Sequence, residues 1–144
     1  MPGIIVGIDS SICSRQALEW AVNEAAVRHA PLTVLTVHQA LASHWGGPVP
    51  ADQDLTSRER EAAQEETDSV LEKAGEEAQP PSVTVRATIG VPAEELLRAA
   101  EDADLLVVGS RGAGGFKRLL MGSVSSQVAH HAHCPVVVIP ADNA

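Results

Sequence analysis

The stretch LLVVGSRGAGGFKRLLMGS, residues 105–123, decides how the fold of this chain is interpreted. It opens with a short apolar run typical of a strand that is buried on both faces. From Gly109 onward it contains five glycines and three cationic side chains, and a helix is expected to begin at Ser123. The first N–H groups of a helix lack intrahelical partners, and the helix dipole favours negative charge there. The loop is therefore predicted to hold an anion, with its glycines allowing sharp turns and close approach to the ligand.

The loop matches neither of the two commonest phosphate-binding motifs. A Walker A loop ends in Gly-Lys-Ser/Thr, whereas here Phe116 precedes Lys117 and Arg118 follows it. In a dinucleotide fingerprint beginning at Gly112, Lys117 would stand in place of the third glycine. Both motifs are therefore excluded.

Apolar runs alternate with helical patterns along the whole chain. Strands are predicted at 4–8, 32–37, 82–89, 105–109 and 135–140. Helices are predicted from Ser11 or Ser14 to His29, over about 56–78, from Pro92, and from Ser123 to about His131. This alternation predicts an α/β fold in which parallel strands carry helices on both faces. The length fits a single domain, 1–144, in which residues 38–55 form a long irregular connection.

The charge of the chain limits its partners. A formal net charge of −9 argues against nucleic acid and against membranes, because anionic surfaces would repel the protein. Residues 1–108 hold seven basic and eighteen acidic side chains, whereas 109–141 holds three basic side chains and no acid. An anionic small ligand therefore suits the C-terminal quarter. No apolar run could span a bilayer and the start lacks the features of a signal peptide, so we expect a cytoplasmic protein.

The glycine spacing Gly109-x2-Gly112-x9-Gly122-Ser123 resembles the nucleotide-binding signature of the universal stress protein family. The resemblance extends to IIVGIDSS at the start, ALEWA in the first helix, GVPAEELLRAAEDADLLVVGSRG and GSVSSQVAHHAHCPVVVIP. Residues 39–80 match least. The resemblance implies an open five-stranded parallel sheet in the order 3-2-1-4-5. This fold is Rossmann-like, of the adenine nucleotide alpha hydrolase-like type, and its ligand lies where the strand order reverses.

The resemblance also implies a binding site for ATP, with any Mg²⁺ carried on the triphosphate. The residues expected to line the base and ribose are Gly7, Ile8, Asp9 and Val37. Those expected around the ribose and first phosphates are Val108, Gly109, Arg111 and Gly112. Those expected at the outer phosphates are Gly122, Ser123, Val124 and Ser125.

Several of these residues also have a purely structural interpretation. Asp9 would cap the helix that starts near Ser11, which need not prevent it from contacting a ligand. The basic residues Arg111, Lys117 and Arg118 would form a solvated surface. Ser123 would be a plain N-cap that still offers its N–H group to a phosphate. The segment HWGGPVP (44–50) would be either a lid or an ordinary loop.

The histidines and cysteines do not predict a metal site. His130, His131, His133 and Cys134 are close in sequence, and His130 and His133 would share one face of a helix. No complete set of four ligands is apparent, however, and the spacing is not that of a zinc motif. We interpret them as the end of a helix. Cys13 follows the first strand and Cys134 precedes the last, so a parallel sheet would hold them at opposite edges, roughly 17 Å apart. Both are predicted to be free thiols.

The last strand predicts a homodimer. In the implied order VVVI (136–139) is an edge strand, and an exposed apolar edge invites pairing with another chain. Members of the family pair antiparallel through this strand, so the resemblance points the same way.

The leading functional hypothesis is a regulator of the stress response that binds ATP. A slow ATPase, or an enzyme that phosphorylates itself on Ser123 or Ser125, is the first alternative. No residue is recognisably set to activate a nucleophile, so catalytic residues are not assigned. The second alternative is a dimeric scaffold that binds no nucleotide, against which the intact glycine spacing argues.

Overall fold

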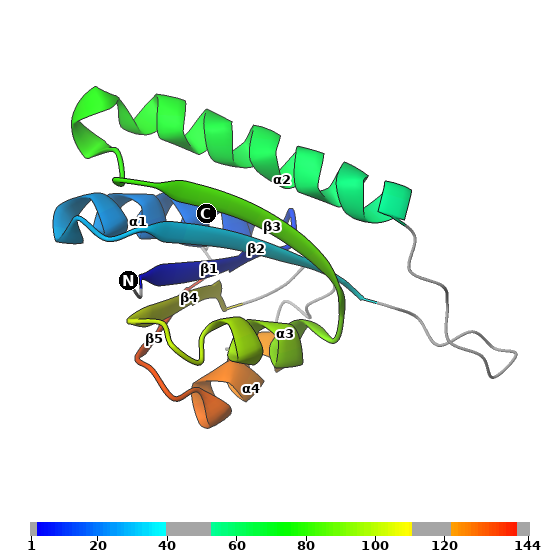
Figure 1. Cartoon of the computed structure of the whole chain (residues 1–144). Helices are drawn as coiled ribbons and strands as arrows, with labels where there is room; N and C mark the ends of the chain where they lie inside the picture. Colours follow the sequence, from blue (N-terminus) through cyan, green and yellow to red (C-terminus); the bar gives the residue numbers. More distant parts are fainter. Residues whose placement is uncertain (1–2, 40–52, 111–121, 141–144) are drawn as a thin grey trace, which may run out of the picture.

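The computed structural model describes residues 3–39, 53–110 and 122–140, which form a parallel sheet flanked by helices (Figure 1). The sheet has five strands in the order β3-β2-β1-β4-β5, which confirms the predicted fold class. The strands are β1 (Ile4–Ile8), β2 (Leu32–Gln39), β3 (Val83–Gly90), β4 (Leu105–Gly109) and β5 (Val136–Ile139). The helices are α1 (Ile12–Arg28), α2 (Gln53–Ala74), η1 (Glu76–Ala78, a 3-10 helix), α3 (Pro92–Ala99) and α4 (Ser123–His131).

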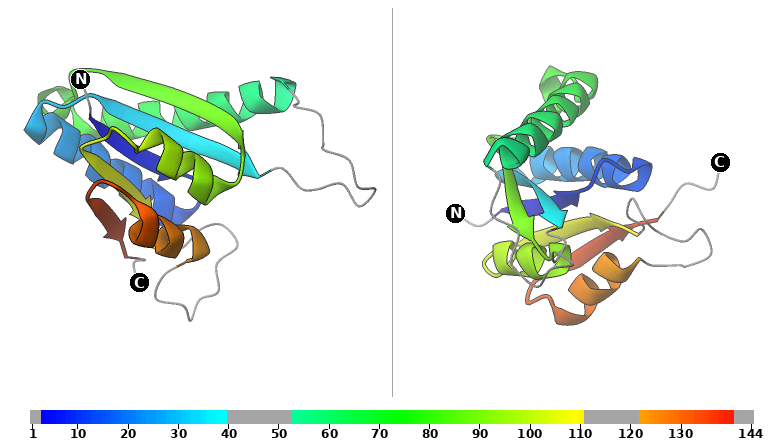
Figure 2. Two further views of the ribbon diagram at one scale, coloured as in Figure 1. Left: turned by 60° about the horizontal axis from the view of Figure 1, so that its bottom comes forward. Right: turned by 90° about the vertical axis from the view of Figure 1, so that its right-hand side faces the viewer.

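Helices cover both faces of the sheet, α1 and α2 on one and α3 and α4 on the other (Figure 2). The core is accordingly split in two. Val6, Leu18 and Val34 belong to the part under α1 and α2. Leu35 and Leu106 belong to the part under α3 and α4. Within the described ranges, no helix is both long and apolar enough to cross a membrane.

The boundaries of α1 agree with the sequence prediction. Ser11 is its N-cap and accepts a hydrogen bond from the Ser14 N–H at 3.1 Å. The helix ends before His29, which takes a left-handed conformation with φ of 53°. Every residue of the predicted apolar stripe is at most 1% exposed, namely Ala17, Leu18, Ala21, Val22 and Ala25.

The segment predicted as one helix over 56–78 is divided. α2 runs from Gln53 to Ala74, and Gly75 separates it from η1. Gly75 has φ of 84°, a conformation that interrupts an α-helix and that glycine adopts easily. The prediction of a continuous helix is therefore wrong at this glycine.

The connection predicted at 38–55 is shorter at both ends. β2 continues to Gln39, because His38 and Gln39 pair with Ile89 and Gly90 of β3. At the other end α2 begins at Gln53. The segment HWGGPVP lies outside the described residues.

The start of α1 lies against the end of β4. A Cβ atom at Gly109 would lie 2.9 Å from Cys13 Sγ and 3.0 Å from the carbonyl carbon and oxygen of Cys13. Among the described glycines, positive φ occurs at Gly75 and not at Gly109. The glycine at 109 is therefore required for close packing of α1 on β4. The expectation that it provides a sharp turn is wrong.

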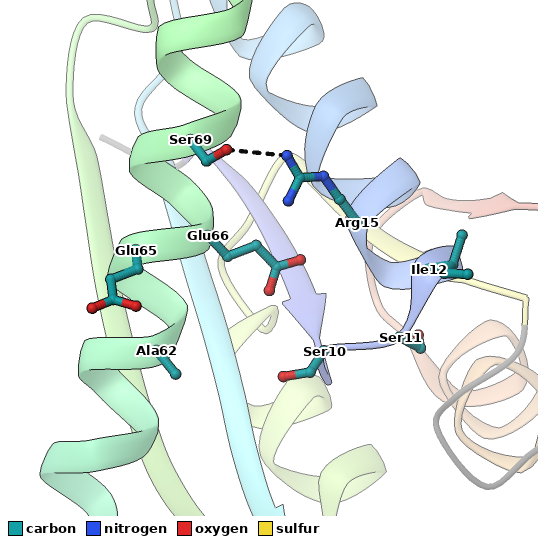
Figure 3. Close-up of a pocket in the computed structure, with 8 residues that line it drawn as sticks. All are labelled: Ser10, Ser11, Ile12, Arg15, Ala62, Glu65, Glu66 and Ser69. Carbon is teal, nitrogen blue, oxygen red and sulfur yellow. Dashed lines mark hydrogen bonds between the residues drawn. The ribbon is translucent and has the colours of Figure 1, made fainter.

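A pocket of about 400 Å³ opens between α1 and α2 (Figure 3). Arg15 reaches across it and donates a hydrogen bond from Nη2 to Ser69 Oγ at 3.1 Å. Glu66 points from α2 toward the same space. Burial raises the pKa of the Glu66 carboxyl above 4.5, an effect opposed by Arg15 and reinforced by Asp9. The residues that line the pocket are Ser10, Ser11, Ile12, Arg15, Ala62, Glu65, Glu66 and Ser69.

Replacing Glu66 by Gln should change the pH dependence of stability. A carboxyl with a raised folded-state pKa contributes stability below its unfolded pKa and loses it as pH rises through the folded pKa. The free energy of unfolding of Glu66→Gln should therefore rise relative to that of the wild type between about pH 4 and pH 7. Urea titrations at both pH values measure this difference. Glu65→Gln, which removes an exposed neighbouring carboxylate, is the control, and an equal pH response of both variants would contradict the interpretation.

Replacing Gly109 by Ala should destabilise the protein by about 1–3 kcal/mol, because the new methyl group meets the backbone of Cys13. Gly7→Ala is the matched control. Its Cβ would lie 2.7 Å from Leu96 Cδ2, which is the end of a flexible side chain, so the loss should be smaller. Denaturant unfolding of both variants compares the two costs. A larger loss for Gly7→Ala would show that side-chain crowding, and not the α1 backbone, is the limiting contact.

Candidate functional site

The sheet divides at the carboxyl ends of β1 and β4. The pairing of β1 with β4 ends at Val6 and Val107. The pairing of β1 with β2 continues to Ile8, and that of β4 with β5 continues to Gly109. The two central strands therefore part over their last residues, at the position where the strand order reverses. This is where open parallel sheets bind ligands.

The residues predicted for the base and ribose lie around this division. Ile8 is buried in the core, and the space beside Gly7 is filled by Leu96 of α3. Val37 is half-buried on the face of the sheet that α3 and α4 cover. Asp9 is exposed immediately after β1. Because the Ile8 side chain is buried and Gly7 has none, these two residues offer mainly backbone groups to a ligand, and Asp9 is the exposed charged group.

Asp9 also shapes the turn between β1 and α1. Its Oδ1 accepts a hydrogen bond from the Ser11 N–H at 3.0 Å, and its own N–H donates to Ser14 Oγ at 3.2 Å. Between them Ser10 takes φ of 69°, which is unusual for a residue other than glycine. The capping role expected for Asp9 is therefore wrong, because Ser11 caps α1 and Asp9 closes the turn that precedes the helix. A carboxylate accepts several hydrogen bonds at once, so forming this turn does not by itself prevent Asp9 from contacting a ligand.

The N-terminus of α4 has the properties that the sequence predicted for an anion site. Gly122 is the N-cap, no side chain among the described residues caps the helix, and the first turn has no acidic residue. The other described helix starts differ. α1 is capped by the side chain of Ser11, and the first turn of α3 carries Glu94 and Glu95. Among these three helices, α4 alone combines a start without a side-chain cap and a first turn without an acid, which favours an external anion.

The predicted phosphate residues of α4 are not equivalent. The N–H of Gly122 donates to the Ser110 carbonyl, so it is already used within the chain. Gly122 has φ of −74°, an ordinary conformation that does not require glycine. Ser123 is exposed, Val124 is half-buried, and Ser125 is 2% exposed. Within the described part of the chain, the N–H groups of residues 123–125 therefore remain for a ligand, whereas the Gly122 N–H does not.

Ser125 and Ser110 form a contact that the sequence did not predict. The Ser125 hydroxyl lies 3.1 Å from the carbonyl oxygens of both Ser110 and Gly122. Ser110 is 3% exposed and contributes through its backbone carbonyl. No sequence pattern identifies this role, since every residue has a carbonyl. Val108 and Gly109 precede it at the end of β4, and Arg111, Gly112, Lys117 and Arg118 lie outside the described residues.

The cysteines and C-terminal histidines occupy separate places. Cys13 is buried and donates from Sγ to the Ile139 carbonyl at 3.3 Å, at the carboxyl end of β5. Cys134 lies before the amino end of β5, and burial raises the pKa of its thiol. Both thiols are free, as predicted. His130 and His131 stand exposed at the end of α4, with ring centroids 6.4 Å apart. No group of three or more potential metal ligands is present among the residues described.

Comparison with known proteins identifies relatives over nearly the whole chain. The sequence profile of the universal stress protein family matches residues 2–140. Universal stress protein Rv2623 of Mycobacterium tuberculosis is 36% identical over 140 residues, which are 95% of this chain and 47% of that protein. The chain thus spans about half the length of the curated relatives it matches.

Solved structures show the same fold. Universal stress protein UspA from Lactobacillus plantarum is 28% identical, with a TM-score of 0.72 that covers 96% of this chain and 97% of that one. A universal stress protein in complex with cAMP is 24% identical, with a TM-score of 0.66 over 96% and 95% of the two chains, which is a likeness of fold alone. With its profile match and its relatives above 30% identity, the chain belongs to the universal stress protein family.

Proposed function

We propose that this protein binds ATP at the division between β1 and β4 and acts as a nucleotide-dependent regulator of the stress response. The observation that carries the proposal is the start of α4, where no side chain caps the helix and no acid occupies the first turn. An anion placed there is stabilised by the unpaired N–H groups and by the helix dipole. The absence of any acid between 109 and 141 keeps the surrounding sequence favourable for a polyphosphate.

The proposed ligand lies across the carboxyl edge of the sheet. The base and ribose would contact backbone groups of Gly7 and Ile8, the Asp9 carboxylate and the end of β2 at Val37. The outer phosphates would accept hydrogen bonds from the N–H groups of residues 123–125. Val108, Gly109, Arg111 and Gly112 would lie around the ribose and the first phosphates, and Gly122 would allow the chain to pass close to them.

A solved structure of the same fold supports an adenine nucleotide as the ligand. A protein of this fold has been solved in complex with cAMP, which shares the adenosine and phosphate groups.

The buried position of Ser125 favours nucleotide binding over self-phosphorylation at this serine, because its hydroxyl is already directed to two carbonyl groups. The residues at the α4 start donate N–H groups and include no acid, so any Mg²⁺ would arrive on the triphosphate. The two free thiols fit the reducing cytoplasm.

Calorimetry with ATP, ADP, AMP and cyclic AMP tests the proposal. The wild-type protein should bind ATP, and Gly122→Val should weaken that binding by at least about tenfold, or about 1.4 kcal/mol, because a branched side chain would crowd the entrance to the first turn. Thr84→Val adds a valine on the exposed side of β3, far from α4 in sequence, and should leave ATP affinity unchanged. Undiminished ATP binding by folded Gly122→Val would refute this placement of the phosphates.

We also propose a homodimer through β5. Among the described strands β5 pairs with β4 alone, and all four of its residues are partly exposed. The carbonyls of Pro135 and Ile139 accept hydrogen bonds from the β4 side. Because backbone groups alternate along a strand, the N–H groups of Val136 and Val138 point away from β4 and are available to a second copy.

Val138→Pro should abolish the dimer, since proline removes an outward N–H group while leaving the hydrogen bonds to β4 intact. Val138→Ala loses side-chain volume but keeps the N–H group, so it should remain dimeric. Sedimentation equilibrium of the wild type and the two variants measures the association. If both variants dissociate equally, side-chain packing holds the copies together and the strand-pairing arrangement is wrong.

A further inference from the structure

We propose that Ser125 is a positioning residue for the phosphate end of the site. It acts by fastening the first turn of α4 to the end of β4, and it does not itself donate its hydroxyl to the ligand. This inference rests on the proposed function, because it concerns how the N–H groups of residues 123–125 are held in place.

The fastening consists of hydrogen bonds that converge on one carbonyl group. The Ser110 carbonyl oxygen accepts from the Gly122 N–H and from the Ser125 hydroxyl, the latter at 3.1 Å. The same hydroxyl lies 3.1 Å from the Gly122 carbonyl oxygen. A serine hydroxyl has a single proton, which here is shared between two acceptors inside the protein. Ser125 is 2% exposed, so water does not compete for these bonds.

The residue that provides this acceptor continues β4 and is held by two other elements of the fold, β5 and α1. The Ser110 N–H donates to the Ile139 carbonyl at 2.8 Å, which extends the pairing of β4 with β5 by one bond. Cys13 of α1 donates from Sγ to the same Ile139 carbonyl at 3.3 Å, and its sulfur lies 3.7 Å from Ser110 Oγ. The carbonyl that receives the Ser125 hydroxyl therefore belongs to the rigid junction of β4, β5 and α1.

This arrangement separates the two functions of Ser125. Its side chain points inward and fixes the orientation of the helix start. Its N–H group belongs to the first turn, where it has no acceptor within the helix. Hydrogen bonds to an anion depend steeply on distance and angle, so a small rotation of this turn would weaken contacts with phosphate. Contacts with the adenosine part depend on the ends of the strands β1, β2 and β4 and not on α4, so they should not respond.

The test compares Ser125→Ala with the wild type in calorimetric titrations with ATP and with adenosine. Loss of one hydrogen bond at the helix start should weaken ATP binding about 5- to 10-fold. Adenosine affinity should stay the same. Ser126→Ala makes the same substitution at the next position of α4 and should bind both ligands like the wild type. Ser125→Cys keeps the size and a weaker donor, so its loss of ATP affinity should be smaller than that of Ser125→Ala.

Each outcome decides the inference. Equal loss of ATP and adenosine affinity would assign Ser125 a merely structural role, and no loss of either would remove it from the site; both results overturn the inference and leave the proposed function standing. If the wild type binds no ATP, the proposed function fails and the inference fails with it. Should Ser125→Ala not fold, the ratio of ATP to adenosine affinity in Ser125→Cys gives the decision: a ratio equal to that of the wild type overturns the inference.

Discussion

The path of the chain across the sheet is the constraint on which the remaining structure depends. The chain begins in the middle at β1, moves outward through β2 to β3, and then returns to the other side of β1 as β4. Parallel strands are joined by right-handed crossovers, so the helices before and after this return lie on opposite faces. The two outward paths diverge at the ends of β1 and β4, where the pairing between these strands stops at Val6 and Val107. The division of the sheet is therefore a consequence of topology.

Local patterns were sufficient to predict most of the elements. β1 and β4 agree with the apolar runs at 4–8 and 105–109, because a strand buried on both faces excludes polar residues along its whole length. α1 was predictable because Ser11 caps it and an alanine-rich stripe covers one side. The α4 boundaries also agree with the prediction. The strand order came from the family resemblance, since these patterns do not determine which strands are neighbours.

The parts that were not predicted depend on tertiary contacts. Nothing in the local sequence reveals that Gly109 faces the backbone of Cys13, a residue far away along the chain. Ser110 acts through its backbone carbonyl group, which every residue has, so the residue type does not reveal this role. A serine such as Ser125 is equally suited to face a ligand or the interior, and its neighbours decide which. At these positions the sequence therefore does not determine which atoms face the interior and which face outward.

The unequal lengths of the strands make the carboxyl edge of the sheet stepped. β2 and β3 remain paired as far as Gln39 and Gly90, whereas β1 ends level with Thr36 (Figure 1). Three residues of β2 therefore project beyond β1, a rise of about 10 Å at the spacing of an extended strand. On the far side of the division the edge meets the start of α4. An elongated molecule lying across this edge would meet the projecting ends of β2 and β3 on one side and the N-terminus of α4 on the other. Its two orientations are thus distinguished by shape before any charge is considered.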